Sequence, residues 1–320
     1  MAVYTKITHN ELINFLKLYE VGELISWNGI TEGIENTNYF IETKSQKFIL
    51  TIYEKRVTKK DLPFFLKLMT HLNKNKFPCP KPIHNKQGNV LNSIKGKPSA
   101  LFSFLSGKSV EYPTWEHCNQ AGLYLSIIHK TSSKFSMQRE NKLSISGWKD
   151  LLSNFRKEVN FFDKDLINII SEELEFISYN WPENLPQGII HADLFPDNVF
   201  FENDIISGVI DFYFACNDFF AYDLAIAINA WCFNEINFLD INKSSALLNG
   251  YQKYRKLSEE EKKILPVLAR GASLRFLLTR VYDSIHLVEG ALVQPKDPLE
   301  YLEKLKYHRN INSFDEYING

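Results

Sequence analysis

The sequence has little cysteine, no excess of charge of one sign and no long apolar run. Its 320 residues contain four cysteines that lie far apart, with no Cys-x-x-Cys pair among them: Cys79, Cys118, Cys216 and Cys232. Structural zinc sites use closely spaced cysteines and disulfide-stabilised domains use many, so both are disfavoured here. The cysteine pattern predicts buried, reduced thiols in a cytoplasmic protein.

Charges of the two signs are nearly equal in number. The chain has 37 Lys and Arg residues against 38 Asp and Glu residues, which gives a formal net charge of -1. A protein that binds DNA or RNA without sequence preference needs a basic surface to displace counterions. We therefore expect no nucleic-acid partner, although a few placed basic groups would suffice for one phosphorylated ligand.

Membrane insertion is also disfavoured. The most apolar long stretch, residues 264–282, is interrupted by Arg270, Arg275 and Arg280, whereas a spanning helix needs about 20 nearly uncharged residues. The first 20 residues contain acidic side chains and no apolar run before a small-residue cleavage site, so no secretory signal is predicted.

The chain changes character about one third of the way along. After a helix predicted by the capping box Thr8-x-x-Glu11, β-rich runs dominate at residues 23–27, 39–43, 48–53 and 100–105, with one helix inserted at Asp61 and Pro63. From Trp115 on, helical spacing prevails at residues 116–129, 151–162, 166–179, 222–233 and beyond 258. The sequence predicts an α+β chain with a small lobe, 1–105, and a larger, mainly helical lobe, 106–320.

One strand–loop–strand block, residues 188–212, carries the chemistry. It contains the spacing H-x-D-x-x-x-x-N at His191, Asp193 and Asn198, and Asp211 follows a second apolar strand. Phosphoryl transfer needs a positioned hydroxyl and divalent metal on the nucleotide phosphates. Asp193 is expected to accept the hydroxyl proton, and Asn198 and Asp211 offer the hard oxygen ligands that Mg²⁺ prefers.

The same residues have more ordinary interpretations when taken singly. A lone H-x-D is more often a polar pair at a strand end, and Asp-Asn after a proline is usually a turn, which is the role we give Asp197. The full spacing, followed by an apolar-flanked Asp, favours the active-site interpretation. His191 is expected to brace the loop by hydrogen bonding and not to act on substrate.

With these motifs the sequence resembles the aminoglycoside phosphotransferase and choline kinase superfamily. The resemblance implies a protein-kinase-like two-lobe fold, with a small antiparallel sheet in the first lobe, and binding of ATP and Mg²⁺. The family's D-x-x-x-D-L-A segment is matched at Asp218–Ala225, and it implies that Asp223 supports the catalytic loop. An acidic residue that stabilises a helix N-terminus is the alternative for Asp223.

Within that superfamily the chain looks like the bacterial homoserine kinases of the phosphotransferase-fold type. The similarity rests on the runs at residues 33–40, 191–198, 208–218 and 274–283, and Phe-Tyr-Phe-Ala-Cys-Asn-Asp at 212–218 is its most distinctive part. It implies transfer of the ATP γ-phosphate to L-homoserine, giving O-phospho-L-homoserine, a step toward threonine.

The nucleotide site departs from the kinase pattern. Residues 29–33 contain two glycines in place of G-x-G-x-x-G, so Gly33, Asn36, Thr37 and Asn38 are candidates for phosphate binding, with a plain hairpin turn as the alternative. The strand at 48–53 has Thr51 where kinases place a phosphate-pairing lysine. Lys47, Lys55 and Arg56 are the candidates to replace its charge.

The remaining candidates concern the adenine and the acceptor. Residues 101–105, with Ser103 and Leu105, are expected to present backbone groups to adenine, and they also suit a buried strand. An amino-acid acceptor needs an Arg for its carboxylate, and the candidates for its pocket lie on two helices: Arg275, Arg280, Asn229 and Trp231. For Arg280 the alternative is an ion pair with Asp283, and for Trp231 it is core packing.

Two other functions remain open at this point. A kinase of the same fold that acts on choline would use an aromatic cage, and one that acts on an aminoglycoside would use an acidic pocket. A non-catalytic nucleotide-binding module is a third possibility, suggested by the absence of lysine at position 51 and opposed by the presence of Asp193, Asn198 and Asp211 together.

Overall fold

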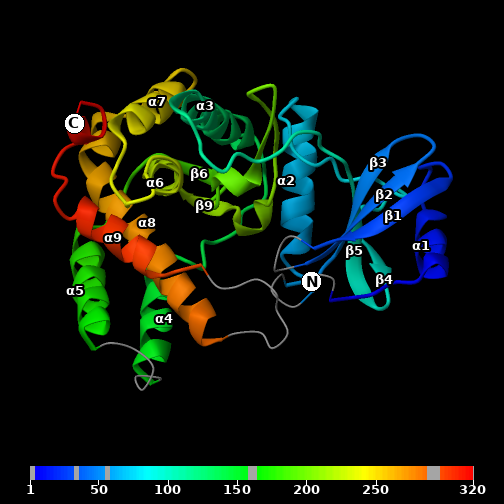
Figure 1. Cartoon of the computed structure of the whole chain (residues 1–320), viewed down its shortest axis with the longest axis horizontal. Helices are drawn as coiled ribbons and strands as arrows, with labels where there is room; N and C mark the ends of the chain where they lie inside the picture. The colour runs from blue at the N-terminus through cyan, green and yellow to red at the C-terminus, as the bar shows by residue number, and fades with distance from the viewer. Residues whose placement is uncertain (1–3, 32–35, 55–57, 158–163, 287–295, 320) are drawn as a thin grey trace. The chain divides into compact units, whose positions relative to one another are not determined.

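A computed structural model describes residues 4–31, 36–54, 58–157, 164–286 and 296–319 (Figure 1). The chain forms two compact units. The first unit contains the residues up to Gly107 together with Ser207–Tyr213, and the second contains Lys108–Ile206 and the described residues from Phe214 on. Asp211 therefore belongs to the first unit, although its place in the sequence assigned it to the lobe of residues 106–320.

A five-stranded antiparallel sheet, in the order β1-β2-β3-β5-β4, forms the first unit. The strands are β1 (Leu24–Ile30), β2 (Thr37–Thr43), β3 (Lys47–Ile52), β4 (Asn92–Ile94) and β5 (Lys97–Ser103). The turn between β2 and β3 is closed by Thr43 N–H donating to Gln46 O at 3.0 Å. This hairpin and the strand near residue 101 were predicted and are confirmed, while β4 was not predicted.

One face of this sheet packs against α1 (His9–Leu16) to form a core. Phe48, Leu50 and Ile52 of β3 are completely buried in it. Because successive side chains of a strand alternate between faces, Thr51 and Tyr53 lie on the other face of the sheet. The predicted capping box at Thr8 is confirmed, with Glu11 N–H donating to Thr8 Oγ1 and Thr8 N–H donating to Glu11 Oε2.

The opposite side of the first unit is covered by α2 (Leu62–Lys74), which follows Asp61 and ends before the predicted proline run (Figure 1). Its Phe65 ring packs edge-on against Tyr213 at 5.6 Å, and Tyr213 packs in the same way against Tyr53. Val209 N–H donates to Pro78 O at 2.9 Å. These contacts fix the segment that carries Asp211 to the first unit.

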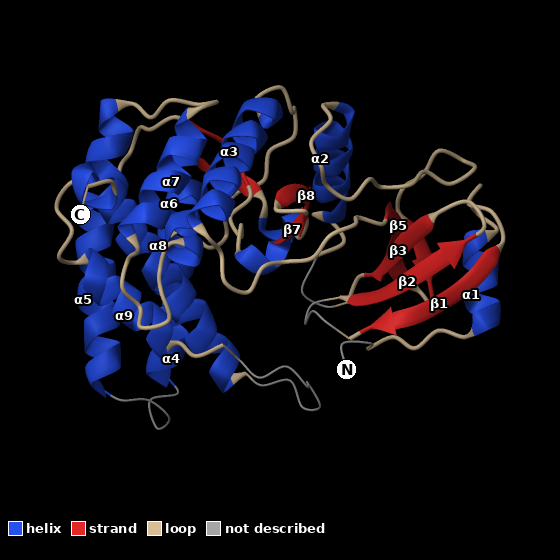
Figure 2. Ribbon diagram, turned by 45° about the horizontal axis from the view of Figure 1, so that its top comes forward, coloured by secondary structure: helices blue, strands red, loops and turns tan. Residues whose placement is uncertain are grey.

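The second unit is built from helices around two short two-stranded sheets (Figure 2). Its helices are α3 (Trp115–Ser132), α4 (Ile145–Lys157), α5 (Lys164–Asn180), α6 (Phe220–Trp231), α7 (Ile241–Gln252), α8 (Glu259–Ile285) and α9 (Leu299–His308). Strands β6 (Gln187–Ile190) and β9 (Cys216–Phe219) pair antiparallel, and β7 (Val199–Glu202) pairs with β8 (Ile205–Val209), whose residues from Ser207 on are counted with the first unit.

Helix α8 contacts α4, α5, α6 and α9 and organises the second unit. The three arginines that interrupt its apolar sequence all have acceptors. Arg270 pairs with the buried Glu173 at 2.5 Å, Arg275 donates to Ala192 O at 2.6 Å, and Arg280 pairs with Glu300 at 2.6 Å. A buried guanidinium needs such partners to offset its lost hydration, so α8 is a core helix.

Helices α3 and α7 approach each other unusually closely, and two glycines make this possible. A Cβ atom on Gly122 of α3 would lie 2.0 Å from Leu247 O, and one on Gly250 of α7 would lie 1.9 Å from Asn119 O. Both distances are far inside van der Waals contact, so only glycine fits at either position.

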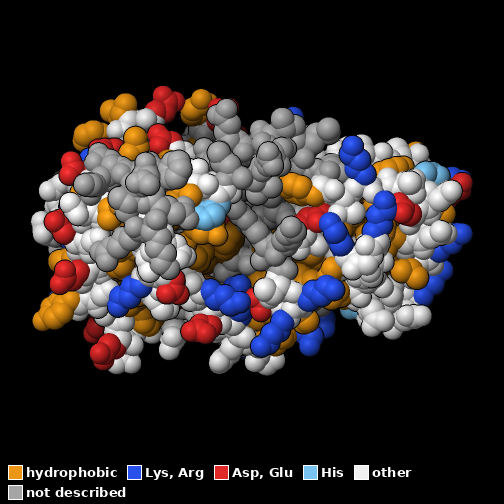
Figure 3. All heavy atoms as spheres, turned by 90° about the horizontal axis from the view of Figure 1, so that it is seen from below, with side chains coloured by type: hydrophobic (Ala, Val, Ile, Leu, Met, Phe, Trp, Pro, Cys, Tyr) orange, Lys and Arg blue, Asp and Glu red, His pale blue; other side chains and the backbone are white. Residues whose placement is uncertain are grey.

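The four cysteines are buried and free, as predicted. Among the described residues, no helix combines the length and the apolar character needed to cross a membrane. On the face in Figure 3, Lys and Arg side chains are interspersed with Asp and Glu side chains. An anionic ligand would meet individually placed cations on this face.

Candidate active site

The loop of residues 191–198 begins where strand β6 ends. Ile189 and Ile190 are buried, and β6 is held by β9 with Ile190 opposite Cys216. Ala192 then adopts a left-handed backbone with φ of 64°. Such a conformation is costly for a residue other than glycine, and it persists where surrounding contacts impose it, as at active sites.

Asp223 of α6 supplies those contacts. Its carboxylate accepts hydrogen bonds from His191 N–H at 2.7 Å and Ala192 N–H at 2.8 Å, and His129 Nε2 lies 3.0 Å away. Burial raises the pKa of Asp223, but the hydrogen bonds from His129 and the His191 amide lower it more, so the net pKa lies below the usual value. The ionised carboxylate of Asp223 thus stabilises the left-handed backbone at Ala192 through these two amide hydrogen bonds.

Other side chains hold the loop at neighbouring points. His191 is completely buried, and its Nδ1 accepts from Asp193 N–H at 3.2 Å. Trp231 Nε1 donates to Leu194 O at 2.7 Å, and Arg275 Nη1 donates to Ala192 O. The loop backbone is therefore fixed by contacts from α6 and α8, while Asp193 itself is only half-buried.

Asn198 is oriented by Asp193. Its Nδ2 donates to Asp193 O at 2.9 Å and to Asp193 Oδ2 at 3.2 Å, at the end of the turn Pro196–Asn198. Because the amide nitrogen is used in this way, the Oδ1 atom points in the other direction. A neutral amide oxygen presented in this manner suits a hard divalent cation.

Asp211 also has a left-handed backbone, with φ of 61°, directly before the turn Phe212–Phe214. Backbone strain of this kind at an acidic residue that follows a strand is typical of functional positions. Carboxylate and amide oxygens are the ligands that Mg²⁺ prefers, so Asn198 and Asp211 each offer a donor atom that suits this metal. Among the described residues, no group of three His, Cys, Asp or Glu side chains forms an alternative metal site.

The sheet face that carries Thr51 is neutral at the position of the kinase lysine. Thr51 is buried, and its hydroxyl donates to Asn38 Oδ1 at 2.8 Å. Lys47 shares this face by strand alternation but lies at the other end of β3, where it is exposed. Gly33, Lys55 and Arg56 lie outside the described residues, and Asn36 is buried with its Oδ1 3.4 Å from Glu54 N.

A lysine–glutamate pair does occur in the first unit, but on the α1 face. Lys97 pairs with Glu54, and Thr5 and Thr37 donate to the same carboxylate at 2.6 and 2.8 Å. Strand register puts Thr37 and Lys97 on the face opposite Thr51. This cluster therefore closes the α1 face of the sheet and does not replace the missing lysine.

The predicted adenine-binding segment, residues 101–105, begins within β5 and continues two residues beyond it. Ser103 N–H donates to Lys81 O and Phe104 N–H donates to Lys47 O, at 2.9 and 3.2 Å. Ser103 therefore has its backbone donor engaged within the unit. The Leu105 side chain packs against Gly208, where a Cβ atom would lie 2.7 Å from it.

The structure alters the predicted acceptor residues. Asn229 is completely buried and joins α6 to α8, since its Nδ2 donates to Ala225 O and Ala269 O and its Oδ1 accepts from Ser273. Arg280 pairs with Glu300, and not with Asp283 as the spacing suggested. Asn229 and Arg280 are thus structural, and Trp231 and Arg275 contact the loop backbone from the core.

One cation near the loop was not predicted. Arg139 Nη1 donates to Ala215 O at 3.0 Å, and its backbone pairs with Asn217 through hydrogen bonds of 2.7 and 2.8 Å. Ala215 directly precedes Cys216, which pairs with Ile190 at the end of β6. A short Arg-Glu-Asn stretch outside any periodic element gave no sequence signal for this position.

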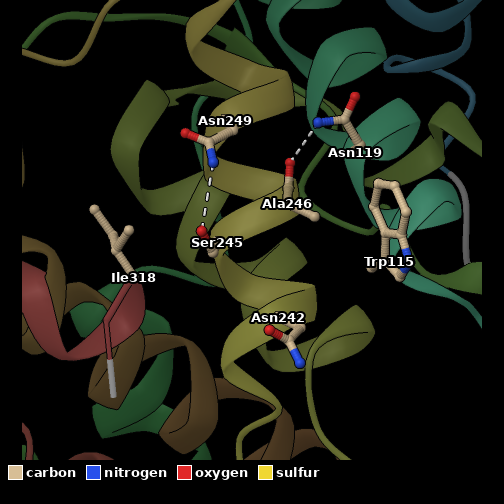
Figure 4. Close-up of a pocket in the computed structure, with 7 residues that line it drawn as sticks. All are labelled: Trp115, Asn119, Asn242, Ser245, Ala246, Asn249 and Ile318. Carbon is tan, nitrogen blue, oxygen red and sulfur yellow. Dashed lines mark hydrogen bonds between the residues drawn. The ribbon is translucent and has the colours of Figure 1, made fainter.

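A groove of about 430 Å³ lies elsewhere on the second unit, at α3, α7 and the C-terminal end (Figure 4). Asn119 Nδ2 donates to Ala246 O at 2.9 Å across it. None of the residues that line the groove has a side chain that titrates between pH 3 and 11, so the groove offers no acid or base. The lining residues are Trp115, Asn119, Asn242, Ser245, Ala246, Asn249 and Ile318.

The chain is similar to known phosphotransferases over most of its length. Residues 26–257 match the model of the phosphotransferase enzyme family. The chain is 50% identical over 317 residues to a homoserine kinase of Sinorhizobium medicae, covering 99% of this chain and 97% of that one, and equally identical to one of Agrobacterium fabrum, of which it covers 98%.

A solved structure shows the same fold at low sequence identity. The spectinomycin phosphotransferase crystallised with ADP and spectinomycin superposes with a TM-score of 0.69 over 98% of both chains, at 17% identity. This likeness confirms the predicted two-lobe, protein-kinase-like α+β fold. With a family match over most of its length and half of its residues shared with curated homoserine kinases, the chain belongs to the phosphotransferase enzyme family, in the branch of the homoserine kinases.

Proposed function

We propose that this chain is an ATP-dependent homoserine kinase, which transfers the γ-phosphate of ATP to the hydroxyl of L-homoserine and supplies O-phospho-L-homoserine for threonine synthesis. The observation that carries the proposal is the identity of 50% with homoserine kinases over 99% of the chain. The loop at residues 191–198 supports it, because its carboxylate and amide are held in defined orientations.

Asp193 is the proposed base. The homoserine hydroxyl oxygen attacks the γ-phosphorus, the bond from phosphorus to the β–γ bridging oxygen breaks, and the hydroxyl proton moves to the Asp193 carboxylate. Phosphoryl transfer depends mainly on positioning and charge stabilisation. His191 and Asp223 serve this step by fixing the loop backbone on which Asp193 is placed.

Asn198 Oδ1 and the Asp211 carboxylate are the proposed ligands of Mg²⁺. When bound, this ion neutralises charge on the nucleotide phosphates. Asp193 orients the Asn198 amide through two hydrogen bonds, so the base and the metal ligand are positioned together.

ATP is proposed to bind on the first unit. Leu105 is the better hinge candidate, because Ser103 N–H and Phe104 N–H already have backbone acceptors. For the phosphates, the Thr51 hydroxyl engages Asn38 Oδ1 and so turns the Asn38 amide N–H groups away from Thr51. We assign Asn38 the donor role that lysine has in related kinases, with Gly33 and Asn36 as the neighbouring candidates.

Arg139 is the proposed partner of the homoserine carboxylate. Its guanidinium donates to Ala215 O, and Ala215 directly precedes Cys216, which pairs with Ile190 just before the loop. The hydroxyl oxygen and the carboxyl carbon of homoserine are separated by at most roughly 5 Å, given four bonds of about 1.5 Å in an extended chain. An acceptor of this length whose hydroxyl is at Asp193 needs its carboxylate partner close to the loop, which favours Arg139.

The proposal is tested by replacing Asp193. We expect Asp193→Asn to lower kcat about 10²- to 10⁴-fold, the usual contribution of a general base. Asp197→Asn is the matched control in the same loop, since Asp197 is exposed and pairs with Lys296 at 3.1 Å. Release of ADP is measured with homoserine, choline and an aminoglycoside as acceptors.

Each outcome of that panel has a meaning. Turnover with homoserine in the wild-type and the Asp197→Asn enzymes, but not in Asp193→Asn, supports the proposal. Turnover with choline or the aminoglycoside alone refutes homoserine as the acceptor, and near wild-type turnover in Asp193→Asn refutes Asp193 as the base. Nucleotide binding without ADP release from any acceptor identifies a non-catalytic module.

A further inference from the structure

A chain of buried hydrogen bonds continues beyond Asp223, away from the loop. His129 Nδ1 lies 2.8 Å from Tyr251 Oη, and Arg255 Nη1 donates to the same phenol oxygen at 3.1 Å. Arg255 Nη2 in turn donates to Glu261 Oε1 at 2.8 Å. Tyr251 lies in the last turn of α7 and Glu261 in the first turn of α8, so the junction of these helices is connected to the catalytic loop.

The donors and acceptors of this chain have one consistent direction. The Asp223 carboxylate only accepts, so His129 Nε2 must carry a proton. A neutral imidazole has one N–H, which makes Nδ1 an acceptor for the Tyr251 hydroxyl. Arg255 only donates, and it fills the remaining acceptor site on the phenol oxygen.

The surroundings keep each group in the required protonation state. Burial lowers the pKa of His129, aided by Arg255, despite the adjoining carboxylate. Burial also raises the pKa of Tyr251, although Arg255 lowers it in part. The imidazole therefore remains neutral and the phenol remains protonated at neutral pH.

We propose that Tyr251 is a positioning residue for phosphoryl transfer, because its hydroxyl selects the His129 tautomer that donates to Asp223. Arg255, anchored by Glu261, holds the phenol in place from the α7–α8 junction. The inference rests on the proposed kinase activity for its kinetic test. Its structural part, the fixing of the His191 and Ala192 amides by Asp223, is measurable without any substrate.

The second unit contains a matched control for this arrangement. Tyr317 Oη lies 2.9 Å from His308 Nδ1, and both residues are completely buried. This pair has the same phenol–imidazole contact as Tyr251 and His129. His308 Nε2 has no hydrogen-bond partner among the described residues, so this pair does not continue to a carboxylate.

The experiment compares Tyr251→Phe with Tyr317→Phe. For Tyr251→Phe we expect kcat to fall about tenfold, short of the hundredfold that a 1 Å displacement of a reacting group costs, with KM for ATP and homoserine changed less than about twofold. Tyr317→Phe is expected to keep the wild-type kcat. Tyr251→Phe loses the hydrogen bonds to His129 and Arg255, whereas Tyr317→Phe loses only the one to His308, so both are expected to lower Tm and Tyr251→Phe to lower it more.

Hydrogen–deuterium exchange provides the readout that is independent of activity. In Tyr251→Phe, peptides that contain residues 191 and 192 are expected to exchange faster, and in Tyr317→Phe they are not. Arg255→Leu is expected to cause the same change more weakly, and Arg255→Lys, which keeps a donor, to restore protection. Unchanged exchange and unchanged kcat in Tyr251→Phe, or equal losses in both phenylalanine variants, would overturn the inference.

Failure of the inference and failure of the proposed function are distinguishable. If the wild-type protein does not phosphorylate homoserine, the proposed function is wrong, but exchange at residues 191 and 192 still tests Tyr251. If homoserine is phosphorylated and Tyr251→Phe behaves like Tyr317→Phe, the kinase assignment holds and the positioning role does not.

Discussion

The arginines near the loop show how burial and partners decide what a guanidinium can do. Arg275 is 2% exposed and donates to the Ala192 carbonyl, and Arg280 is paired with Glu300. Both side chains are buried, so a substrate carboxylate would have little access to either guanidinium. Arg139 is half-buried beside the loop and contacts a carbonyl at the edge of β9.

This difference predicts the effect of Arg139→Gln. Loss of a charge-assisted contact of about 1.5–3 kcal/mol is expected to raise KM for homoserine roughly 10- to 100-fold, with KM for ATP unchanged. The acceptor 3-aminopropan-1-ol has the same hydroxyl and amine but no carboxylate. Its kcat/KM is expected to be the same in wild type and variant.

Steady-state kinetics with both acceptors checks this prediction. Arg280→Gln is the matched control, and it is expected to lower Tm while KM for homoserine stays within about twofold, since Arg280 serves Glu300. Equal losses with both acceptors in Arg139→Gln would show that Arg139 acts on the loop and not on the carboxylate.

At the level of elements, the close approach of α3 and α7 depends on two glycines, Gly122 and Gly250. Gly250→Ala would place a methyl group 1.9 Å from Asn119 O, so the helices must separate. Overpacking of this kind typically costs about 1–3 kcal/mol, and we expect Gly250→Ala to destabilise the second unit by at least that amount.

Urea denaturation followed by circular dichroism measures this cost. Asn249→Ala changes the neighbouring, exposed residue of α7 and is expected to alter the unfolding free energy by less than about 0.5 kcal/mol. A Gly250→Ala protein as stable as Asn249→Ala would show that the two helices are free to move apart.

Elements with strong local signals were predictable from the sequence, and those that depend on distant partners were not. The capping box at Thr8 predicted α1 because both of its hydrogen bonds are local. Helix α7 was missed because its residues INKSSALLNGYQ are poor helix formers, and packing against α3 stabilises it. Strand β9 contains Asn217 and Asp218, which are rare in strands, and forms by pairing with β6.

The residues of the candidate site also fall into those that local spacing predicts and those that distant partners place. The spacing of His191, Asp193 and Asn198 was readable because one short loop contains all three residues. The partners of Arg280 and Asn229 come from α9 and α8, and no sequence spacing specifies them. Arg139 acquires its position through pairing with Asn217, which is 78 residues away.

On the scale of the whole molecule, two buried histidines predict how stability depends on pH. Burial, together with Lys304 and Arg270, lowers the pKa of His308 to about 3, and burial lowers that of His129. The folded protein keeps both neutral, whereas the unfolded chain takes up protons below about pH 6.5. Stability is therefore complete above that pH and decreases as the pH falls below it.

Below pH 6.5 the slope from His308 approaches about 1.4 kcal/mol per pH unit, and the lowered pKa of His129 adds to it in the same direction. Thermal or urea unfolding at pH 7.5, 6.5 and 5.5 measures the slope for the wild-type protein. His308→Gln cannot take up the proton, so its stability is expected to fall less steeply between pH 6.5 and 5.5. A wild-type stability that is constant over this interval would contradict the prediction.

In protein kinases, activity is switched by making and breaking an ion pair between the β3 lysine and a glutamate of the following helix. Here β3 carries Thr51, hydrogen-bonded to Asn38, and α2 has no acidic residue between Leu62 and Lys74. The ion pair by which protein kinases are switched therefore cannot form between β3 and α2 as the structure describes them. A displacement of α2 would act on the small lobe through packing, such as the contact of Phe65 with Tyr213, and not through that pair.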